Sequence, residues 1–219
     1  MSTKRRSQRP RITLPKTLTL LRGSHTDREK GVCVMEAVAW LAGEPHSDTP
    51  ACACPIICKA SNIMNDCAPS DEIRTSVLKP YLTRLVGSKA TPEIEKRRMF
   101  AIADLAVRTF AADAMESARL PEEAKKLRAL GVIVDEPTAK AAALAAEGAA
   151  EAAGYASMAA ALAAVAAGHA ALAAVLAVSG AATWAAGAAS WAVWDAGDAA
   201  KAEAWTRYTT MILDTLLEI

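Results

Sequence analysis

Apolar and polar residues follow one another along most of this chain with the spacing of helices. After residue 30, apolar side chains recur every three or four positions, which places them on one face of a helix. Typical start signals precede these segments: Ser70 can cap a helix, and Pro55, Pro92 and Pro121 suit a first turn. We therefore expect helices over residues 31–43, from 55, over 70–87 with a kink at Pro80, from 91, and over 121–130.

One segment near the N-terminus departs from this spacing. From Ile12 to Leu20 the apolar residues fall on alternate positions, as in a half-buried strand, and Pro15 restricts that strand to a sheet edge. Its expected partner is the β-branched run 132–134. The fold class predicted is mainly α, with a compact helical domain that carries a small two-stranded β-ribbon, followed by a long alanine-rich antiparallel helical hairpin or coiled coil. The boundaries are a disordered basic arm over 1–10, the helical domain over 11–134 and the hairpin over 135–219.

The alanine-rich tail is the most regular part of the pattern. Between Ala152 and Trp194 there is no Asp, Glu, Lys or Arg, and the larger side chains follow alternating steps of four and three, the repeat of a helix-packing seam. The first seam consists of Leu144, Gly148, Glu151, Tyr155, Met158, Leu162, Val165, His169, Leu172 and Leu176. A second seam of bulkier residues consists of Trp184, Trp191, Trp194, Trp205, Tyr208 and Ile212.

These seams predict one helix over about 135–178, some ~60 Å long, and a second helix that returns after Ser179-Gly180. The alternative is a continuous helix that pairs with a second copy of the chain. A transmembrane hairpin is disfavoured, because alanine is only marginally apolar and the uncharged run holds few Leu, Val or Ile. The facing pairs of the hairpin are Tyr155 with Trp205, His169 with Trp191, and Leu176 with Trp184.

Charge changes this picture only at the N-terminus. The whole chain has a net charge of +1, but residues 1–30 hold nine Lys and Arg against two acidic residues. This arm could contact phosphates without sequence preference. No helix-turn-helix, zinc-finger or aromatic RNA-binding signature accompanies it. No phosphate-binding glycine loop is present, so nucleotide hydrolysis has no support, and no cofactor is predicted. The candidate nucleic-acid contacts are Lys4, Arg5, Arg6, Arg9 and Arg11.

Five cysteines and the absence of an apolar signal segment favour reduced thiols in a cytoplasmic protein. Cys33 falls at a helix start, where the helix dipole can stabilise a thiolate, and His46 and Asp48 are the nearest base and orienting acid. The glycine followed by cysteine at a helix start is similar to papain-like and deubiquitinase nucleophiles over a few residues, which implies a cysteine hydrolase. A buried structural cysteine is the favoured interpretation.

Two further groups of residues carry candidate chemistry. Zinc could be held by Cys52, Cys54, Cys58 and Cys67, although their spacing is not the repeated C-x₂-C of structural zinc sites, and structural thiols are favoured. A flat ligand could stack in the tail, although a core role is favoured for these side chains. The candidate ligand residues are His169, Trp184, Trp191, Trp194 and Trp205.

Three segments carry a resemblance: GVCVMEAVAWLAGEPHSDTPACACPII, LKPYLTRLVGS and RRMFAIADLAVRTFAADAMESARL. Over roughly residues 10–135 the chain resembles uncharacterised alanine-rich proteins of actinobacteria and their phages. The resemblance implies no activity, but a phage source would imply a host-directed or anti-defence role.

We expect a non-enzymatic binding protein that self-associates as a homo-oligomer through its alanine-rich helices. A host protein or a small nucleotide is a further potential partner, and a membrane is not expected. The alternatives left open are a cysteine hydrolase that uses Cys33 and a nucleotide- or nucleic-acid-binding module.

Overall fold

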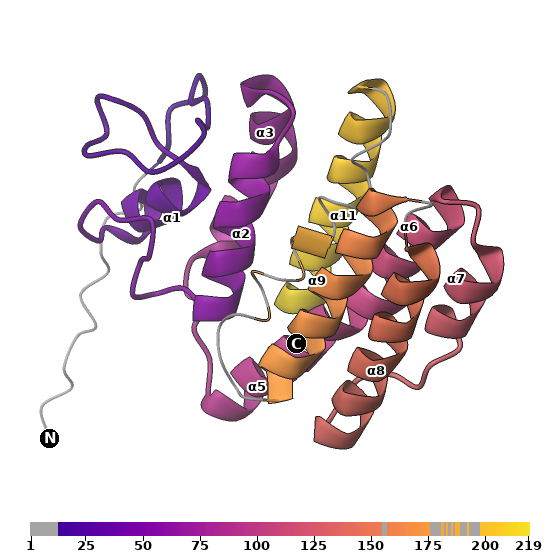
Figure 1. Cartoon of the computed structure of the whole chain (residues 1–219). Helices are drawn as coiled ribbons and strands as arrows, with labels where there is room; N and C mark the ends of the chain where they lie inside the picture. Colours follow the sequence, from indigo (N-terminus) through magenta and orange to yellow (C-terminus); the bar gives the residue numbers. More distant parts are fainter. Residues whose placement is uncertain are drawn as a thin grey trace, which may run out of the picture.

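The computed structural model describes residues 13–154, 157–175 and 198–219, together with positions 181, 183, 185, 187, 188 and 192. The protein is mainly α-helical, as the spacing of apolar residues predicts (Figure 1). The first group of helices is α1 (Val34–Ala42), α2 (Pro55–Cys67), α3 (Asp71–Leu78), the 3₁₀ turn η1 (Lys79–Tyr81) and α4 (Leu82–Leu85). The remaining elements are α5 (Pro92–Asp104), the π-helical η2 (Leu105–Ala111), α6 (Ala112–Ser117), α7 (Pro121–Arg128), α8 (Glu136–Ala153), α9 (Met158–Val175) and α11 (Asp198–Glu218).

Local sequence signals account for most of the helix ends. The Ser70 hydroxyl accepts a hydrogen bond from the Ile73 amide at 3.2 Å and caps α3. At the other end of α1, Gly43 adopts a left-handed conformation with φ of 68°, which glycine reaches without steric cost. The helix expected over residues 70–87 is interrupted at Pro80, where the 3₁₀ turn η1 lies between α3 and α4.

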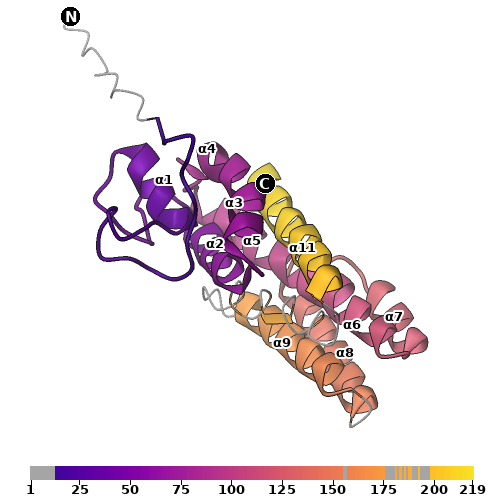
Figure 2. The same ribbon diagram turned by 90° about the horizontal axis from the view of Figure 1, so that it is seen from above.

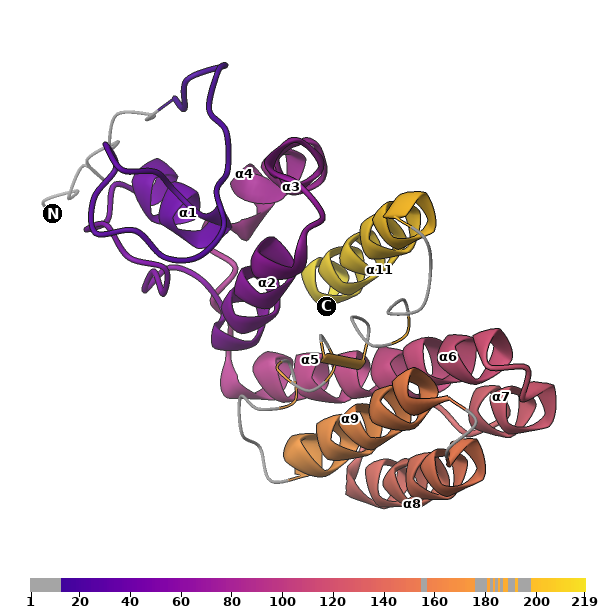
Figure 3. The ribbon, with the colours of Figure 1, turned by 45° about the horizontal axis from the view of Figure 1, so that its top comes forward.

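A central rod organises the helices. In Figure 3, α5, η2 and α6 follow one another as one nearly straight element, and α9 lies between this rod and α8. On the other side of the rod, α11 packs against α2, α3 and α5. The carboxylate of Asp113 joins α6, α7 and α11, because it accepts hydrogen bonds from Arg128, Arg207 and the Tyr208 hydroxyl.

One cluster of buried side chains runs from Leu20 to Leu216. Its members therefore lie on both sides of residue 134, where the sequence predicted a domain boundary, and that boundary stays a prediction. Among the described residues, no helix is long and apolar enough to span a bilayer.

The expected β-ribbon is wrong: residues 13–154, 157–175 and 198–219 contain no strand. In the run 132–134, side-chain oxygens accept hydrogen bonds from the backbone amides that pairing in a β-sheet would use. The Ile133 amide donates to the Asp104 carboxylate at 2.9 Å, and the Val134 amide donates to the Thr138 hydroxyl at 3.1 Å. The alternating pattern near the N-terminus belongs instead to an irregular segment that packs on the helices.

The single helix expected from residue 135 to 178 is also wrong. It is broken at Gly154, whose φ of 43° and ψ of −128° lie outside the helical region, and α8 and α9 then lie side by side (Figure 2). The reversal expected at Ser179-Gly180 lies outside the described residues. So do Tyr155, Trp191, Leu176 and Trp184, so the expected facing pairs stay predictions.

The break changes which side chains of the tail are buried. Between α8 and the rest of the bundle the buried residues are alanines, including Ala142, Ala146, Ala163 and Ala167. The larger residues of the first seam face outward instead. The exposed members are Leu144, Met158, Val165 and Leu172.

Candidate functional site

Cys33 is the N-cap residue of α1, and its thiol is not activated. The Sγ atom accepts a hydrogen bond from the Glu36 amide at 3.5 Å, and the residue is buried. Burial raises the pKa of the Cys33 thiol to about 12, and the neighbouring Glu36 carboxylate also raises it. The expectation that the helix start stabilises a thiolate is therefore wrong, because loss of solvation outweighs the favourable backbone donors.

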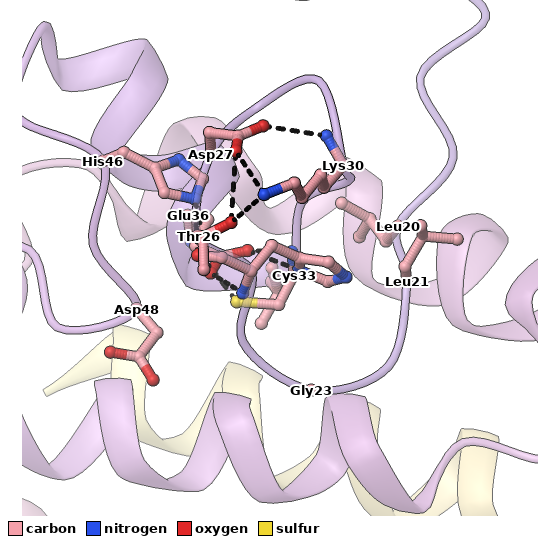
Figure 4. Close-up of polar contacts among 12 residues, drawn as sticks. Leu20, Leu21, Gly23, Thr26, Asp27, Lys30, Cys33, Glu36, His46 and Asp48 are labelled. Carbon is pink, nitrogen blue, oxygen red and sulfur yellow. Dashed lines mark hydrogen bonds and ion pairs between the residues drawn. The ribbon is translucent and has the colours of Figure 1, made fainter.

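His46 and Asp48 do not form a catalytic arrangement with this thiol. The Nε2 atom of His46 donates to the His25 carbonyl at 3.0 Å and lies 3.5 Å from a Glu36 carboxylate oxygen. Asp48 contributes only its backbone carbonyl, which accepts from the Cys58 thiol at 3.1 Å. In Figure 4 the Asp48 carboxylate points away from His46 and Cys33. The three candidates thus lie in one region without the contacts that a nucleophile, base and acid require.

Glu36 is the centre of this region, although it was not among the site residues predicted from the sequence. Its side chain is only 1 % exposed, and it accepts hydrogen bonds from the His25 amide at 2.6 Å, the His25 Nδ1 at 2.9 Å and the Cys33 amide at 2.7 Å. Burial by itself would raise the pKa of Glu36. The hydrogen bonds from His25 and Cys33 outweigh burial, and the pKa lies below its ordinary value.

The arrangement around Glu36 holds two loops onto α1. Cys33 and Glu36 form a reciprocal capping box, and His25 comes from the loop that precedes the helix. His46 comes from the loop that follows the helix (Figure 4). Gly31 completes the fit, because its φ is +138° and a Cβ there would lie 2.6 Å from the Leu21 side chain. The chemistry of this cluster is that of a buried polar anchor.

The four other cysteines do not share a site. Cys54 is the N-cap of α2 and Cys67 is the last residue of that helix, so the two ends are separated by about 20 Å at 1.5 Å per residue. Cys58 is buried and donates to a backbone carbonyl, and Cys52 is partly exposed. In the part of the chain that the structure describes, no three His, Cys, Asp or Glu side chains are placed to hold a metal ion.

The candidate ligand residues of the tail fall in different places. Trp205 is buried, and its indole Nε1 donates to the Met64 carbonyl of α2 at 3.1 Å, so it is part of the core between α11 and α2. His169 lies on the outer surface of α9. Outside the described residues lie Trp184, Trp191 and Trp194, as well as Lys4, Arg5, Arg6, Arg9 and Arg11.

His169 belongs to a groove of about 700 Å³ between α8 and α9. Large apolar side chains at this groove are exposed to solvent: Leu144 is 69 %, Val165 42 % and Leu172 45 % exposed. The groove floor is made of small residues, and charged side chains stand along α8. The lining residues of α8 are Lys140, Ala143, Leu144, Glu147, Ala150 and Glu151, and those of α9 are Ala161, Ala164, Val165, Gly168, His169 and Leu172.

Half of the residues of the first seam therefore line the α8–α9 groove. Its members Leu144, Glu151, Val165, His169 and Leu172 all line the groove, although the seam was expected to pack against the returning helix. Figure 3 shows α8 on the outside of the bundle, with α9 between it and the central rod. Exposed contiguous apolar surface of this kind is typical of an interaction site.

Comparisons with protein families, curated proteins and solved structures find no match for this chain. The resemblance to alanine-rich proteins of actinobacteria and their phages stays a prediction.

Proposed function

We propose that this is a non-enzymatic interaction protein that associates with a second copy of itself through the outer face of α8 and α9. The observation that carries the proposal is the exposure of Leu144, Val165 and Leu172 along one groove. Soluble chains rarely leave several large apolar side chains open on one face unless another surface covers them.

A second copy suits this face because the face contains both parts of a packing interface. Leu144 and Leu172 project as ridges, while Ala143, Ala164 and Gly168 form a floor with room for side chains. A two-fold axis places the same surface on both partners, so a face that has ridges and hollows can pack against itself.

The size of the face predicts a weak dimer. Each helix has 18 residues, so α8 and α9 are about 27 Å long, and two helices about 10 Å wide present roughly 540 Å². A stable interface of standard size uses about 800 Å² on each partner. We therefore expect a dissociation constant in the micromolar range, with dimers forming at the concentrations of a typical biophysical measurement.

The features around Cys33 favour this proposal over a cysteine hydrolase. The thiol is buried and burial raises its pKa to about 12, and His46, the predicted base, is bonded to a backbone carbonyl. A nucleophile needs a thiolate within hydrogen-bond reach of its base. A host-directed role and a cytoplasmic location remain part of the proposal, and they rest on the resemblance and on the free cysteines.

Sedimentation velocity over a concentration series tests the proposal. The wild-type chain is expected to shift from monomer to dimer as the concentration rises through the micromolar range. Replacement of Leu144 by Glu removes apolar surface from both copies and places a charge at the interface. Full burial of a leucine is worth about 1.5–3 kcal/mol, and Leu144 has 69 % of its surface left to bury. The loss over two copies is therefore about 2–4 kcal/mol, or roughly 30- to 1000-fold in the dissociation constant.

Ala141→Glu is the matched control. Ala141 is exposed on the same helix but does not line the groove, so the added charge is expected to leave association unchanged. A wild-type chain that stays monomeric up to several hundred micromolar, or equal effects of the two substitutions, would show that this face does not mediate self-association.

A further inference from the structure

The charged side chains of the α8–α9 groove are arranged unevenly along α8. Lys140 lies in the second turn of the helix, and Glu147 and Glu151 lie two and three turns further on. Together with Leu144 they follow steps of four, three and four, which places all four side chains on one face of the helix. The groove cation Lys140, which pairs with Glu136, therefore lies nearer the N-terminus of α8, and the carboxylates Glu147 and Glu151 lie nearer its C-terminus.

We propose that the α8 helices of two copies lie antiparallel across the two-fold axis, with Lys140 of each copy next to Glu147 and Glu151 of the other. This inference rests on the self-association proposed above and specifies its geometry. An antiparallel pairing centred between Leu144 and Glu147 matches position 140 with 151 and position 144 with 147. Each copy then contributes one cation and two anions to complementary ends of the same interface.

A parallel pairing of the same face is disfavoured by charge. It would place Lys140 against its own symmetry mate, and it would also bring the two copies of Glu147 and of Glu151 together. Like charges in direct opposition are destabilising, whereas the antiparallel arrangement turns the same residues into attractive pairs. The charge pattern thus selects one of the two directions in which identical helices can meet.

Lys140 is free to take part in such a contact without loss to the fold. Among the described residues its ion pair is with Glu136, one turn earlier, and both side chains are more than half exposed. A pair of this kind contributes little to helix stability and exchanges readily with another partner. Glu147 and Glu151 are exposed as well.

The small residues of the groove explain how the helices approach closely enough for these contacts. Ala143 and Ala150 lie beside the charged positions on α8, and Ala161, Ala164 and Gly168 face them from α9. Leu144 of one copy can therefore enter the hollow of the other, while the longer lysine and glutamate side chains reach across at the two ends.

Charge reversal with measurement of the dimer dissociation constant tests the direction of pairing. In the antiparallel arrangement, Lys140→Glu places three acids together at each end, and Glu147→Lys with Glu151→Lys places three bases together. Each variant is expected to weaken its own dimer about tenfold or more at low salt. An equimolar mixture of the two is expected to form a heterodimer close to wild-type affinity, because every pair is attractive again.

Lys125→Glu serves as the matched control, because Lys125 is an exposed lysine on α7 outside the groove. In a parallel dimer Lys140→Glu exchanges one repulsive pair for another and leaves the dissociation constant unchanged. An unchanged constant for Lys140→Glu, combined with a dimer that Leu144→Glu disrupts, would therefore overturn the antiparallel direction while self-association stands. A monomeric wild-type chain would overturn both proposals.

Discussion

The buried Glu36 carboxylate offers the most direct test of how the N-terminal loops are held. Replacement by Gln keeps the size of the side chain but removes its charge and turns one acceptor into a donor. The carboxylate accepts from the His25 amide, the His25 ring and the Cys33 amide, all at 2.9 Å or less. A glutamine amide group necessarily directs an N–H group at one of these donors.

The expected loss of stability follows from these contacts. A hydrogen bond to a buried charged acceptor is worth about 1.5–3 kcal/mol, and an unpaired buried donor adds a desolvation cost. We expect Glu36→Gln to lower the free energy of unfolding by about 2–4 kcal/mol. For a chain of this length that corresponds to a decrease of about 5–15 °C in the midpoint of thermal unfolding.

The effect of Glu36→Gln on stability is expected to depend on pH in a definite direction. The pKa of Glu36 in the folded protein lies below its ordinary value, so the ionised carboxylate stabilises the fold. This contribution is complete above the pKa of the unfolded chain and is lost as the pH falls through the folded pKa. The difference between wild type and Glu36→Gln is therefore expected to be largest near neutral pH and to shrink on acidification below about pH 4.5.

Thermal unfolding followed by circular dichroism at several pH values measures both effects. Glu29→Gln is the control, because Glu29 is an exposed carboxylate in the same loop. The stabilising role of the Glu36 carboxylate would be refuted if the unfolding midpoint of Glu36→Gln lay within 2 °C of the wild-type midpoint. It would also be refuted if the difference between the two midpoints stayed constant from pH 7 to pH 4.

Two further predictions concern the thiols and the tail. Iodoacetamide at neutral pH is expected to label the exposed Cys67 first in the folded protein. The buried Cys33 and Cys58 are expected to react far more slowly, because burial raises the pKa of each thiol to about 12. Mass spectrometry of the digested protein reads the order, and rapid labelling of Cys33 would contradict the prediction. Trp205→Phe is expected to lower the free energy of unfolding, measured with urea, by about 1–3 kcal/mol. The reason is that the buried Met64 carbonyl of α2 loses the indole N–H that donates to it. An unchanged unfolding midpoint would argue against this contact.

The local part of the fold could be predicted because it depends on few residues. The cap at Ser70 and the left-handed end at Gly43 act within one turn, so the sequence alone contains their cause. Glycines inside the tail are different. Gly148 and Gly168 stay within α8 and α9 while Gly154 ends a helix, so the residue type alone does not distinguish the three positions.

The sequence predicted where polar side chains gather, but not which residue lies at their centre or what these side chains do. The segment around Cys33 does gather polar groups, yet the residue at their centre is Glu36. Its apolar neighbours Met35 and Ala37 were a signal that the carboxylate is buried. Its main partner, His25, comes from an irregular loop, and no periodicity in the sequence connects the two positions.

The tail also shows why a repeat of large residues need not mark the inside of a protein. The two helices approach so closely that a Cβ at Gly168 would lie 3.5 Å from the Ala143 carbonyl oxygen. A Cβ at this distance is in ordinary van der Waals contact, which suits small residues. Alanines and glycine therefore form the internal interface, and Leu144, Val165 and Leu172 are exposed on the other face. Burial of that outer face then requires a surface from outside the hairpin. The same spacing that was expected to close an intramolecular hairpin therefore supports the proposed association between chains.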